Sequence, residues 1–557
     1  SLIMIGSYAF SGCTGLTSLE IPNGVTSIDT YAFNGCSNLR NLRLGTGLVT
    51  IGSRSFSGCS GLVNLEIPGS VMTIGSYAFS GCSALTGLIL HDGIVTIQGQ
   101  AFSGCTELTS VEIPASVLSI QDRAFASCPQ LAALDIAEDN PAYVSVEGVL
   151  YNQDRTVLLD YPAAREGPFT IPAGVNTIAD YAFNGRTRLT GIVFPPGLLN
   201  IGSYAFYGCT GLTDADIPDT VTTIGSRAFY GCIRLSSLTI GHGVTSIGSY
   251  AFTGCSSLTA VVVGNGVTTL GSYAFLSCTN LESVFLPASV TVIQDRVFDG
   301  CSRLAAINVA VDNPAYSSTD GLLLNQSGTT LIQCPGGKTG SCVIPAGVTT
   351  IADYAFNGRT GLTHVELPDG LVSIGSRAFN GCTGLTSVVI PDRVTWIDSY
   401  AFNGCTGLAS LTLGAGVAAI GNYAFSGCNQ LAELIIPDHV ITIGSYAFNA
   451  CSGLSSLTLG SRITTIESYA FYNCSGLTGV TIPASVISIQ ARAFDACSGL
   501  SAISVAAENP AYASVEGVLF NRAATALIQF PRGRSGAYEM PEGVLSVEDY
   551  AFQGCTG

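Results

Sequence analysis

Charged side chains and histidine are scarce in this sequence. Charged residues make up 11% of the 557 residues, with 21 basic against 38 acidic side chains and four histidines. Nucleic-acid binding and docking on an anionic membrane both need clustered Lys and Arg, so a net charge of −17 argues against nucleic acid and membrane partners. Long apolar runs are also missing, so we expect no membrane insertion of this segment.

Side-chain arrangements that carry catalysis are missing too. The four histidines (His91, His242, His364 and His439) stand at four different positions relative to the repeat described below, so they cannot converge on one metal ion. We find no paired carboxylates, no Ser-His-Asp or Cys-His arrangement and no phosphate-binding glycine loop. We therefore expect no enzyme activity, no metal and no cofactor.

What the sequence does contain is one repeat in many copies. Its most regular residue, here called the marker Phe, recurs every 23 residues in three blocks, and 58 residues separate each block from the next marker. A fixed period of this length is typical of a solenoid, whose units bury their apolar faces only against their neighbours. We expect a single solenoid of about 20 coils over residues 1–557. The marker residues are Phe10, Phe33, Phe56, Phe79, Phe102, Phe125, Phe183, Phe206, Phe229, Phe252, Phe275, Phe298, Phe356, Phe379, Phe402, Phe425, Phe448, Phe471, Phe494 and Phe552.

One repeat predicts two short strands and a turn. Residues 19–21 alternate apolar and polar side chains, as a half-buried strand does, and Pro22 ends that strand. Residues 25–28 can form a second strand on another side of the coil. The segment around Phe10 favours a short helical or 3₁₀ turn, which would point Phe10 and Cys13 inward.

Each 58-residue gap holds an insertion with a hairpin-like pair of apolar segments. Arg186 and Arg359 replace the cysteine of the repeat in the coils that follow the first two insertions. We expect these arginines to tie the insertions down, through acids such as Glu138 or Asp312. The alternative is that the hairpins project as binding loops. The insertions lie near residues 137–171, 310–344 and 506–540.

Eighteen of the twenty cysteines stand three residues after a marker Phe. Equivalent positions in parallel coils keep their β-carbons about one coil spacing apart, whereas a disulfide prefers about 3.8 Å. We therefore predict a ladder of small, buried thiols.

The other two cysteines, Cys334 and Cys342, lie in the second insertion. They occupy the positions of Tyr161 and Phe169 in the first insertion, and a second aromatic pair fills these positions in the third. A pair that is exchanged as a unit indicates two side chains in contact. We predict a Cys334–Cys342 disulfide, with two packed free thiols as the alternative.

The position two residues before the marker Phe holds Tyr thirteen times, Arg six times and Gln once. Long, flat side chains in neighbouring coils can stack as cation–π pairs. One interpretation is a lateral ladder that covers the edge of the core. The other is an exposed stripe that binds carbohydrate, matrix protein or another copy of the chain. These residues are Tyr8, Tyr31, Arg54, Tyr77, Gln100, Arg123, Tyr181, Tyr204, Arg227, Tyr250, Tyr273, Arg296, Tyr354, Arg377, Tyr400, Tyr423, Tyr446, Tyr469, Arg492 and Tyr550.

The outward positions of the longer strand form a second candidate face. They are mostly small and polar, so a solvated sheet is one interpretation and a binding face the other. Scattered apolar residues on this face are Ile89, Val262, Phe285, Val389 and Ile435. Asn325 and Asn473 begin Asn-X-Ser sequons and are candidate glycosylation sites.

The order Cys-x-x-Leu-x-x-Leu-x-Ile-Pro-x-x-Val-x-x-Ile, followed by Ala-Phe, resembles the BspA-type leucine-rich repeat of bacterial and protist surface proteins. The resemblance covers nearly the whole chain, although Gly or Ser replaces the usual Asn near residue 24. It implies a leucine-rich-repeat solenoid with parallel strands, located outside the cell or on its surface. It also implies adhesion or ligand binding, without enzyme activity, to host or matrix proteins or glycans.

The alternative function is structural, with copies of the chain assembling into an extracellular filament or surface layer. Near-identical coils and a bland surface favour this alternative. The sequence starts and stops inside a repeat, without a polar cap, so we expect the chain to continue beyond both ends.

Overall fold

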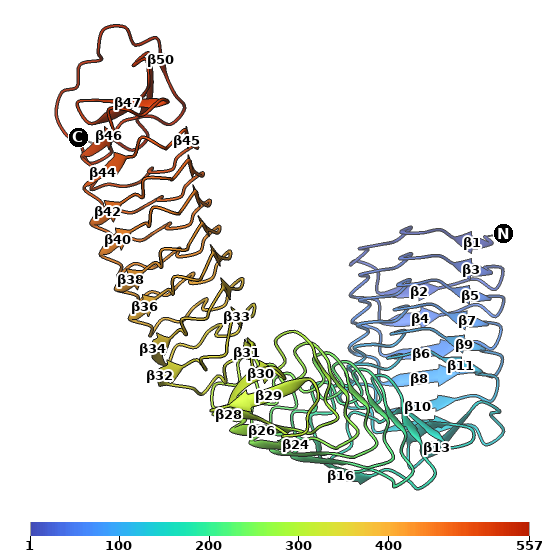
Figure 1. The fold of residues 1–557 in the computed structure, drawn as a ribbon. Helices are drawn as coiled ribbons and strands as arrows, with labels where there is room; N and C mark the ends of the chain where they lie inside the picture. Colours follow the sequence, from blue (N-terminus) through green and yellow to red (C-terminus); the bar gives the residue numbers. More distant parts are fainter. Residues whose placement is uncertain (1, 556–557) are drawn as a thin grey trace. The chain divides into compact units, whose positions relative to one another are not determined.

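The structure is a computed structural model that describes residues 2–555, and all regular secondary structure in this range is β-strand. Each coil contributes two strands, which pair in parallel with the equivalent strands of the next coil (Figure 1). The register equals the sequence period, so that Ile28 pairs with Ile51 and Ile51 with Ile74. This architecture confirms the repeat solenoid predicted from the period.

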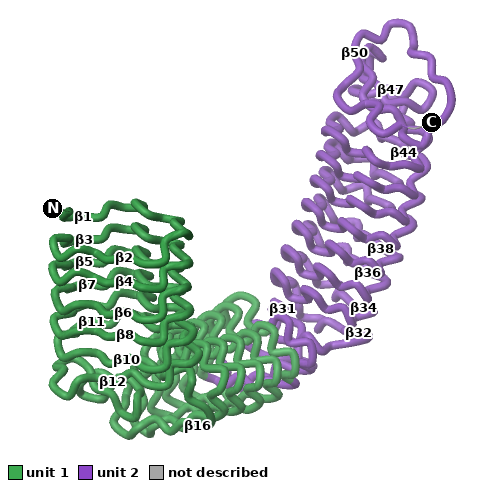
Figure 2. Tube along the Cα trace, turned by 180° about the vertical axis from the view of Figure 1, so that it is seen from behind, with its two compact units in different colours: residues 1–281, 289–298 green, residues 282–288, 299–557 purple. Residues whose placement is uncertain are grey.

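The chain forms two compact units (Figure 2). The first comprises residues 1–281 and 289–298, and the second comprises residues 282–288 and 299–557. Each unit has its own stack of coils and its own core. The single domain expected over residues 1–557 stays a prediction.

One ladder consists mainly of two-residue strands, most of which end in a buried Ile. In the first unit these strands are β1 (Met4–Ile5), β3 (Ser27–Ile28), β5 (Thr50–Ile51), β7 (Thr73–Ile74), β9 (Thr96–Ile97), β11 (Ser119–Ile120), β17 (Thr177–Ile178), β19 (Asn200–Ile201), β21 (Thr223–Ile224), β23 (Ser246–Ile247), β25 (Thr269–Leu270) and β27 (Val292–Ile293). In the second they are β33 (Thr350–Ile351), β35 (Ser373–Ile374), β37 (Trp396–Ile397), β39 (Ala419–Ile420), β41 (Thr442–Ile443), β43 (Thr465–Ile466), β45 (Ser488–Ile489) and β50 (Ser546–Val547).

The other ladder consists of strands of three to five residues, whose side chains alternate between core and solvent. In the first unit these are β2 (Ser18–Glu20), β4 (Asn41–Arg43), β6 (Asn64–Ile67), β8 (Gly87–Leu90), β10 (Ser110–Ile113), β12 (Ala133–Ile136), β16 (Gly167–Thr170), β18 (Leu189–Val193), β20 (Asp214–Ile217), β22 (Ser237–Ile240) and β24 (Ala260–Val262). In the second they are β26 (Ser283–Leu286), β28 (Ala306–Val309), β32 (Gly340–Val343), β34 (Leu362–Glu366), β36 (Ser387–Val389), β38 (Ser410–Thr412), β40 (Glu433–Ile435), β42 (Ser456–Thr458), β44 (Gly479–Ile482) and β46 (Ala502–Val505).

The core is a ladder of stacked marker Phe rings. The ring centroids of Phe33 and Phe56 lie 5.1 Å apart with their planes at 6°, and both side chains are fully buried. Phe10, which stacks on a neighbour on one side only, is 42% exposed. Burial of each ring therefore depends on the coils on either side.

The repeat cysteines line the same core. Most of these thiols donate to the carbonyl oxygen of the marker Phe one coil earlier, as Cys59 Sγ does to Phe33 O at 3.4 Å. All twenty cysteines are free thiols, and eighteen of them are buried. Burial raises the pKa of Cys209 and Cys255 to about 12.

The helical or 3₁₀ segment predicted around the marker Phe was wrong, because residues 2–555 contain neither. Alternate amides of this segment bond in two directions. Ala32 N and Asn34 N donate within the turn, whereas Phe33 N donates to Ser55 O of the next coil at 2.7 Å. Since every second N–H belongs to the inter-coil ladder, the bonds of a helix cannot form there.

Each insertion forms an antiparallel hairpin that joins the ladder of short strands. The hairpins pair β13 (Tyr143–Val146) with β14 (Val149–Asn152), β29 (Tyr316–Thr319) with β30 (Leu322–Asn325), and β47 (Tyr512–Val515) with β48 (Val518–Asn521). A third strand then leads in parallel into the next coil: β15 (Val157–Asp160), β31 (Thr330–Gln333) or β49 (Ala526–Gln529). The insertions are therefore continuous with the sheet.

A buried asparagine fixes the start of each insertion. Asn140 donates from Nδ2 to the carbonyl oxygens of Pro114 and Val117 in the preceding coil, both at 3.0 Å. Its Oδ1 accepts the backbone N–H groups of Ala142 and Tyr143. Asn313 and Asn509 are fully buried at the equivalent positions.

Arg186 and Arg359 are buried and contact the insertions, but not through the predicted acids Glu138 and Asp312. Arg186 Nη2 lies 2.6 Å from Asp160 Oδ1, and Arg359 Nε donates to Cys334 O at 2.8 Å, with Asp299 at 3.7 Å. Glu138 and Asp312 are exposed instead. An arginine at the inward-facing cysteine position can reach only acids that also face inward, which excludes these two.

Replacing a fully enclosed marker Phe should cost more stability than replacing Phe10. We expect Phe402→Ala to lower the free energy of unfolding by about 3–5 kcal/mol, because the ring leaves a cavity between two coils. Phe10→Ala should cost clearly less, since that ring is 42% exposed. Urea unfolding followed by circular dichroism measures both, and equal losses would contradict this account of the core.

The buried thiols should resist alkylation in the folded protein. At pH 8 a thiol with a pKa of about 12 is ionised on the order of 10⁻⁴ of the time, and burial also blocks access. We expect iodoacetamide to modify the exposed Cys13 in native protein, and Cys209 and Cys255 only in denaturant. Peptide mass spectrometry after timed alkylation measures this, and similar rates at the three sites would disprove it.

Candidate functional site

The residues two positions before the marker Phe, here called the Tyr/Arg stripe, share a left-handed backbone. Their φ angles lie between 54° and 64° in all twenty coils. This conformation costs a residue with a side chain about 1–2 kcal/mol, and Gly is the residue that adopts it freely. No coil has Gly there, so interactions of the Tyr and Arg side chains must offset a repeated backbone cost.

Stacking along the stripe provides part of this compensation. Tyr400, Tyr423, Tyr446 and Tyr469 form a continuous stack with centroids 4.6–4.7 Å apart and planes within 5°. Aromatic pairs contribute about 0.5–1.5 kcal/mol beyond their area burial. The lateral-ladder interpretation therefore has a physical basis.

Arginine and glutamine fit the same stack. The guanidinium of Arg54 lies 4.4 Å from the ring centroid of Tyr77, and Arg54 Nη1 donates to Tyr31 Oη at 2.9 Å. Gln100 Nε2 donates to Tyr77 Oη at 2.7 Å. The stripe thus accepts three residue types: Tyr stacks on its neighbours, whereas Arg54 and Gln100 also donate to the preceding tyrosine hydroxyl.

Four stripe arginines have no carboxylate within ion-pair distance among residues 2–555. They are Arg54, Arg123, Arg227 and Arg377. By contrast, Arg492 Nε lies 2.7 Å from Asp495. Arg123 has the same place before its insertion, but Ala126 replaces the aspartate, and its buried Nε has no hydrogen-bond partner. The stripe is therefore locally cationic on an acidic chain.

A groove of about 500 Å³ follows the stripe in the first unit. One side is the stripe itself, and the other is the position directly after the marker Phe. Most coils have a small or polar residue there, but two successive coils have Tyr207 and Tyr230, whose rings stack at 4.9 Å. We call this the Tyr/Arg groove. Its lining residues are Arg123, Tyr181, Asn184, Tyr204, Tyr207, Arg227, Tyr230 and Tyr250.

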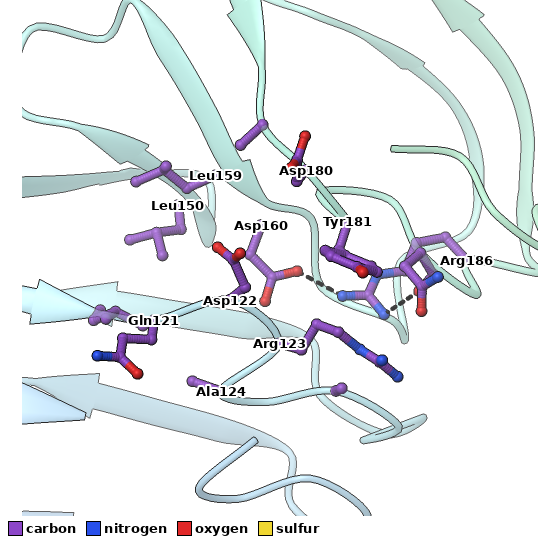
Figure 3. Close-up of a pocket in the computed structure, with 14 residues that line it drawn as sticks. Gln121, Asp122, Arg123, Ala124, Leu150, Leu159, Asp160, Asp180, Tyr181 and Arg186 are labelled. Atoms are coloured by element: carbon purple, nitrogen blue, oxygen red, sulfur yellow. Dashed lines mark hydrogen bonds and ion pairs between the residues drawn. The ribbon is translucent and has the colours of Figure 1, made fainter. Parts of the chain in front are cut away.

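A smaller cavity of about 50 Å³ lies beside the groove at the first insertion (Figure 3). Arg123, Tyr181 and Asn184 line both, and the Asp160–Arg186 ion pair lines the small cavity. Burial raises the pKa of Asp122, and the charge of Asp180 raises it further. Burial also raises the pKa of Tyr181, whose hydroxyl is therefore protonated at neutral pH.

The described residues contain no group of three His, Cys, Asp or Glu side chains that could hold a metal ion. Residues 2–555 also contain no helix that is long and apolar enough to cross a membrane. On the long-strand face, Ile89, Val262, Phe285, Val389 and Ile435 are each more than half exposed.

Sequence reasoning identified the stripe but not the groove. The period shows which residues share a position in the coil, whereas the groove combines two positions, three residues apart, that the fold brings together. The signal that could have found it is the pair Tyr207 and Tyr230, since only one other coil has an aromatic residue at that position.

The aromatic pairs equivalent to Cys334 and Cys342 are in contact. The ring centroids of Tyr161 and Phe169 lie 4.8 Å apart, and those of Phe530 and Tyr538 lie 5.0 Å apart. Both cysteines are buried free thiols. A hydrogen bond between the two thiols raises the pKa of Cys334 and lowers that of Cys342. The two thiols are therefore in contact, and the disulfide between them stays a prediction.

The two sequon asparagines have different surroundings. Asn325 Oδ1 accepts the backbone N–H of Thr329 at 2.8 Å, and Asn325 Nδ2 donates to Thr329 Oγ1 at 3.0 Å. These two hydrogen bonds cap the hairpin turn, so the presence of Asn at position 325 has a structural reason that does not require a glycan. Asn473 is exposed on a turn. Glycosylation stays a prediction at both.

Comparisons with known proteins agree with the fold. The family model described as a BspA type leucine rich repeat region matches residues 3–132, 176–305, 336–433 and 418–531. A crystal structure of a leucine-rich repeat protein from Eubacterium ventriosum is similar at 28% identity and a TM-score of 0.50, over 62% of this chain and 91% of that one. No curated protein matches the chain.

Two further solved structures are similar at lower TM-scores. The pneumococcal vaccine antigen PcpA shares 22% identity over 66% of this chain and 85% of its own, with a TM-score of 0.48. A leucine rich cell surface protein from Faecalibacterium prausnitzii shares 26% identity over 66% of this chain and 96% of its own, with a TM-score of 0.43.

We predict that Cys334 and Cys342 form a disulfide when the protein folds under oxidising conditions. In the chain-entropy model so short a loop adds about 2–3 kcal/mol to the free energy of unfolding. Non-reducing peptide mapping should detect the linked peptides in the wild type, and Cys334→Ala should leave Cys342 free. Two free thiols in protein purified from an oxidising compartment would refute the prediction.

Proposed function

Because the chain belongs to the BspA-type leucine-rich repeat family, we propose that it is a ligand-binding or adhesion protein displayed outside the cell, with the Tyr/Arg stripe as its binding face. The family consists of repeat proteins that are generally not enzymes. The location rests on the family resemblance, and the candidate ligands are matrix or host proteins and glycans.

The single observation that carries the choice of face is the left-handed backbone of the stripe. In twenty coils, Tyr, Arg or Gln occupies a conformation that favours Gly. Tyr and Arg are also the residues enriched in binding hot spots. The long-strand face offers mainly small polar side chains and a few exposed apolar ones, which makes it the weaker candidate.

The stacked arrangement suits binding because it is already ordered. A partner must normally immobilise flexible side chains, at about 0.5–1.5 kcal/mol each. In the stripe, Tyr423 is held between Tyr400 and Tyr446, and Arg227 between Tyr204 and Tyr250. Little further ordering is needed when a ligand docks.

The test compares two double variants against purified matrix proteins and glycans on a biosensor. Tyr204→Gln with Tyr423→Gln changes the stripe in both units, and Gln100 shows that Gln fits this position. Val262→Thr with Ile435→Thr changes the strand face, where Thr239 and Thr458 are natural equivalents. We expect the stripe variant to bind at least tenfold more weakly, about 1.4 kcal/mol, and the strand-face variant to bind like the wild type.

Far-UV circular dichroism spectra that match the spectrum of the wild type confirm that both variants are folded. Loss of binding in the strand-face variant alone would move the site to the other face. Electron microscopy of the wild type tests the alternative function, self-assembly. Ordered filaments or sheets, abolished by the stripe variant, would establish self-assembly as the function in place of ligand binding.

A further inference from the structure

We propose that the Tyr/Arg groove binds a linear acidic glycan, with carboxylate or sulfate groups held by Arg123 and Arg227. This assignment rests on the proposed function and names the ligand class of one segment of the stripe. It is carried by the chemistry of the groove lining and by the unpaired charge of the two arginines.

The lining calls for a ligand rich in hydroxyl groups. Each of the eight lining side chains carries a hydrogen-bonding group, and none is aliphatic. Pockets for drug-sized ligands are mostly apolar with a few polar groups, and a peptide with apolar side chains would need apolar subsites. A chain of sugar units matches this lining better than either.

The stacked rings present their edges to the ligand. Tyr181 lies 4.8 Å from Tyr204 with planes at 16°, and Tyr207 stacks on Tyr230 at 7°. Because the ring faces are covered by neighbours, hydroxyl groups and ring edges form the groove surface. Two such columns run side by side, since Tyr204 also contacts Tyr207 at 5.7 Å. They provide rows of hydrogen-bonding groups along the coil axis, which suits a linear ligand.

Neither arginine has a carboxylate within ion-pair distance among residues 2–555. The guanidinium of Arg227 lies between the rings of Tyr204 and Tyr250, at 5.4 and 4.7 Å, and its Nη1 donates to Tyr204 Oη. A guanidinium has five N–H donors, so most remain for an anion. Arg123 is stacked 5.2 Å from Tyr181. A guanidinium held flat in this way is suited to bidentate binding of a carboxylate or sulfate.

The two charges stand apart along the groove. Going from coil to coil, the order is Arg123, Tyr181, Tyr204 and then Arg227. A ligand that reaches both must carry acidic groups at more than one point along its length. The nearby carboxylate of Asp180 accepts the backbone N–H of Ser203 at 2.6 Å, so it is engaged in the coil itself.

Isothermal titration calorimetry of the full chain tests the proposal with four defined polymers. Polygalacturonate carries carboxylates, dextran sulfate carries sulfates, dextran is neutral and polyglutamate is an acidic peptide. We expect binding to at least one acidic glycan and none to dextran, with weaker binding at 200 mM than at 50 mM salt. The arm that binds more tightly identifies the acidic group.

Matched variants locate the site. Arg227→Gln should weaken glycan binding at least tenfold, whereas Arg54→Gln, elsewhere on the stripe, should change it less than twofold. Gln100 shows that both substitutions preserve the bond to the preceding tyrosine hydroxyl. Tyr207→Ser with Tyr230→Ser removes the second column and installs the residue of Ser57 and Ser80 at that position. This double variant should also weaken binding at least tenfold, with an unchanged melting temperature.

Three outcomes would overturn the proposal: no binding of either acidic glycan, equal effects of Arg227→Gln and Arg54→Gln, or polyglutamate binding as tightly as the glycans. The proposed function survives each of them if the stripe double variant still loses a matrix ligand. If no stripe variant changes the binding of any ligand, the proposed function and the acidic-glycan proposal are both refuted.

Discussion

The parallel stacking of coils is the interaction on which every other feature depends. Since the register equals the sequence period, each residue within a block of coils lies beside the residue 23 positions later, and most side chains pack against the same or a similar residue type. The same rule produces the Phe, Cys and Tyr ladders. It also limits substitution, because coils approach closely at Gly75, where a β-carbon would lie 2.7 Å from the backbone carbon of Gly52.

Much of this follows from the sequence, because the period itself states which side chains will be neighbours. It predicted the marker Phe core, the buried cysteines and the two strands of each coil. Comparing the three insertions with one another predicted the contact between positions 161 and 169, which the rings of Tyr161 and Phe169 make. In each case the inference needed only that equivalent positions have equivalent surroundings.

The features that could not be predicted involve groups outside one position of the repeat. The prediction of a helical segment was wrong because backbone amides such as Phe33 N donate to the next coil, and side-chain patterns do not reveal these bonds. The partners of Arg186 and Arg359 depend on which acids face inward after the insertion closes. The left-handed backbone of the stripe is also invisible in the sequence, because Gly is missing from the positions that would signal it.

The two interpretations of the Tyr/Arg stripe are compatible once regular and irregular coils are distinguished. Stacking explains why long, flat side chains occupy a left-handed backbone throughout the chain. It does not explain Tyr207 and Tyr230, since most coils stack equally well with a small or polar residue at that position. Nor does it explain Arg123, whose equivalent Arg492 has an aspartate partner. These departures from the repeat create a cationic groove while the stack of the Tyr/Arg stripe continues through it, so a binding role requires only changes that the scaffold already tolerates.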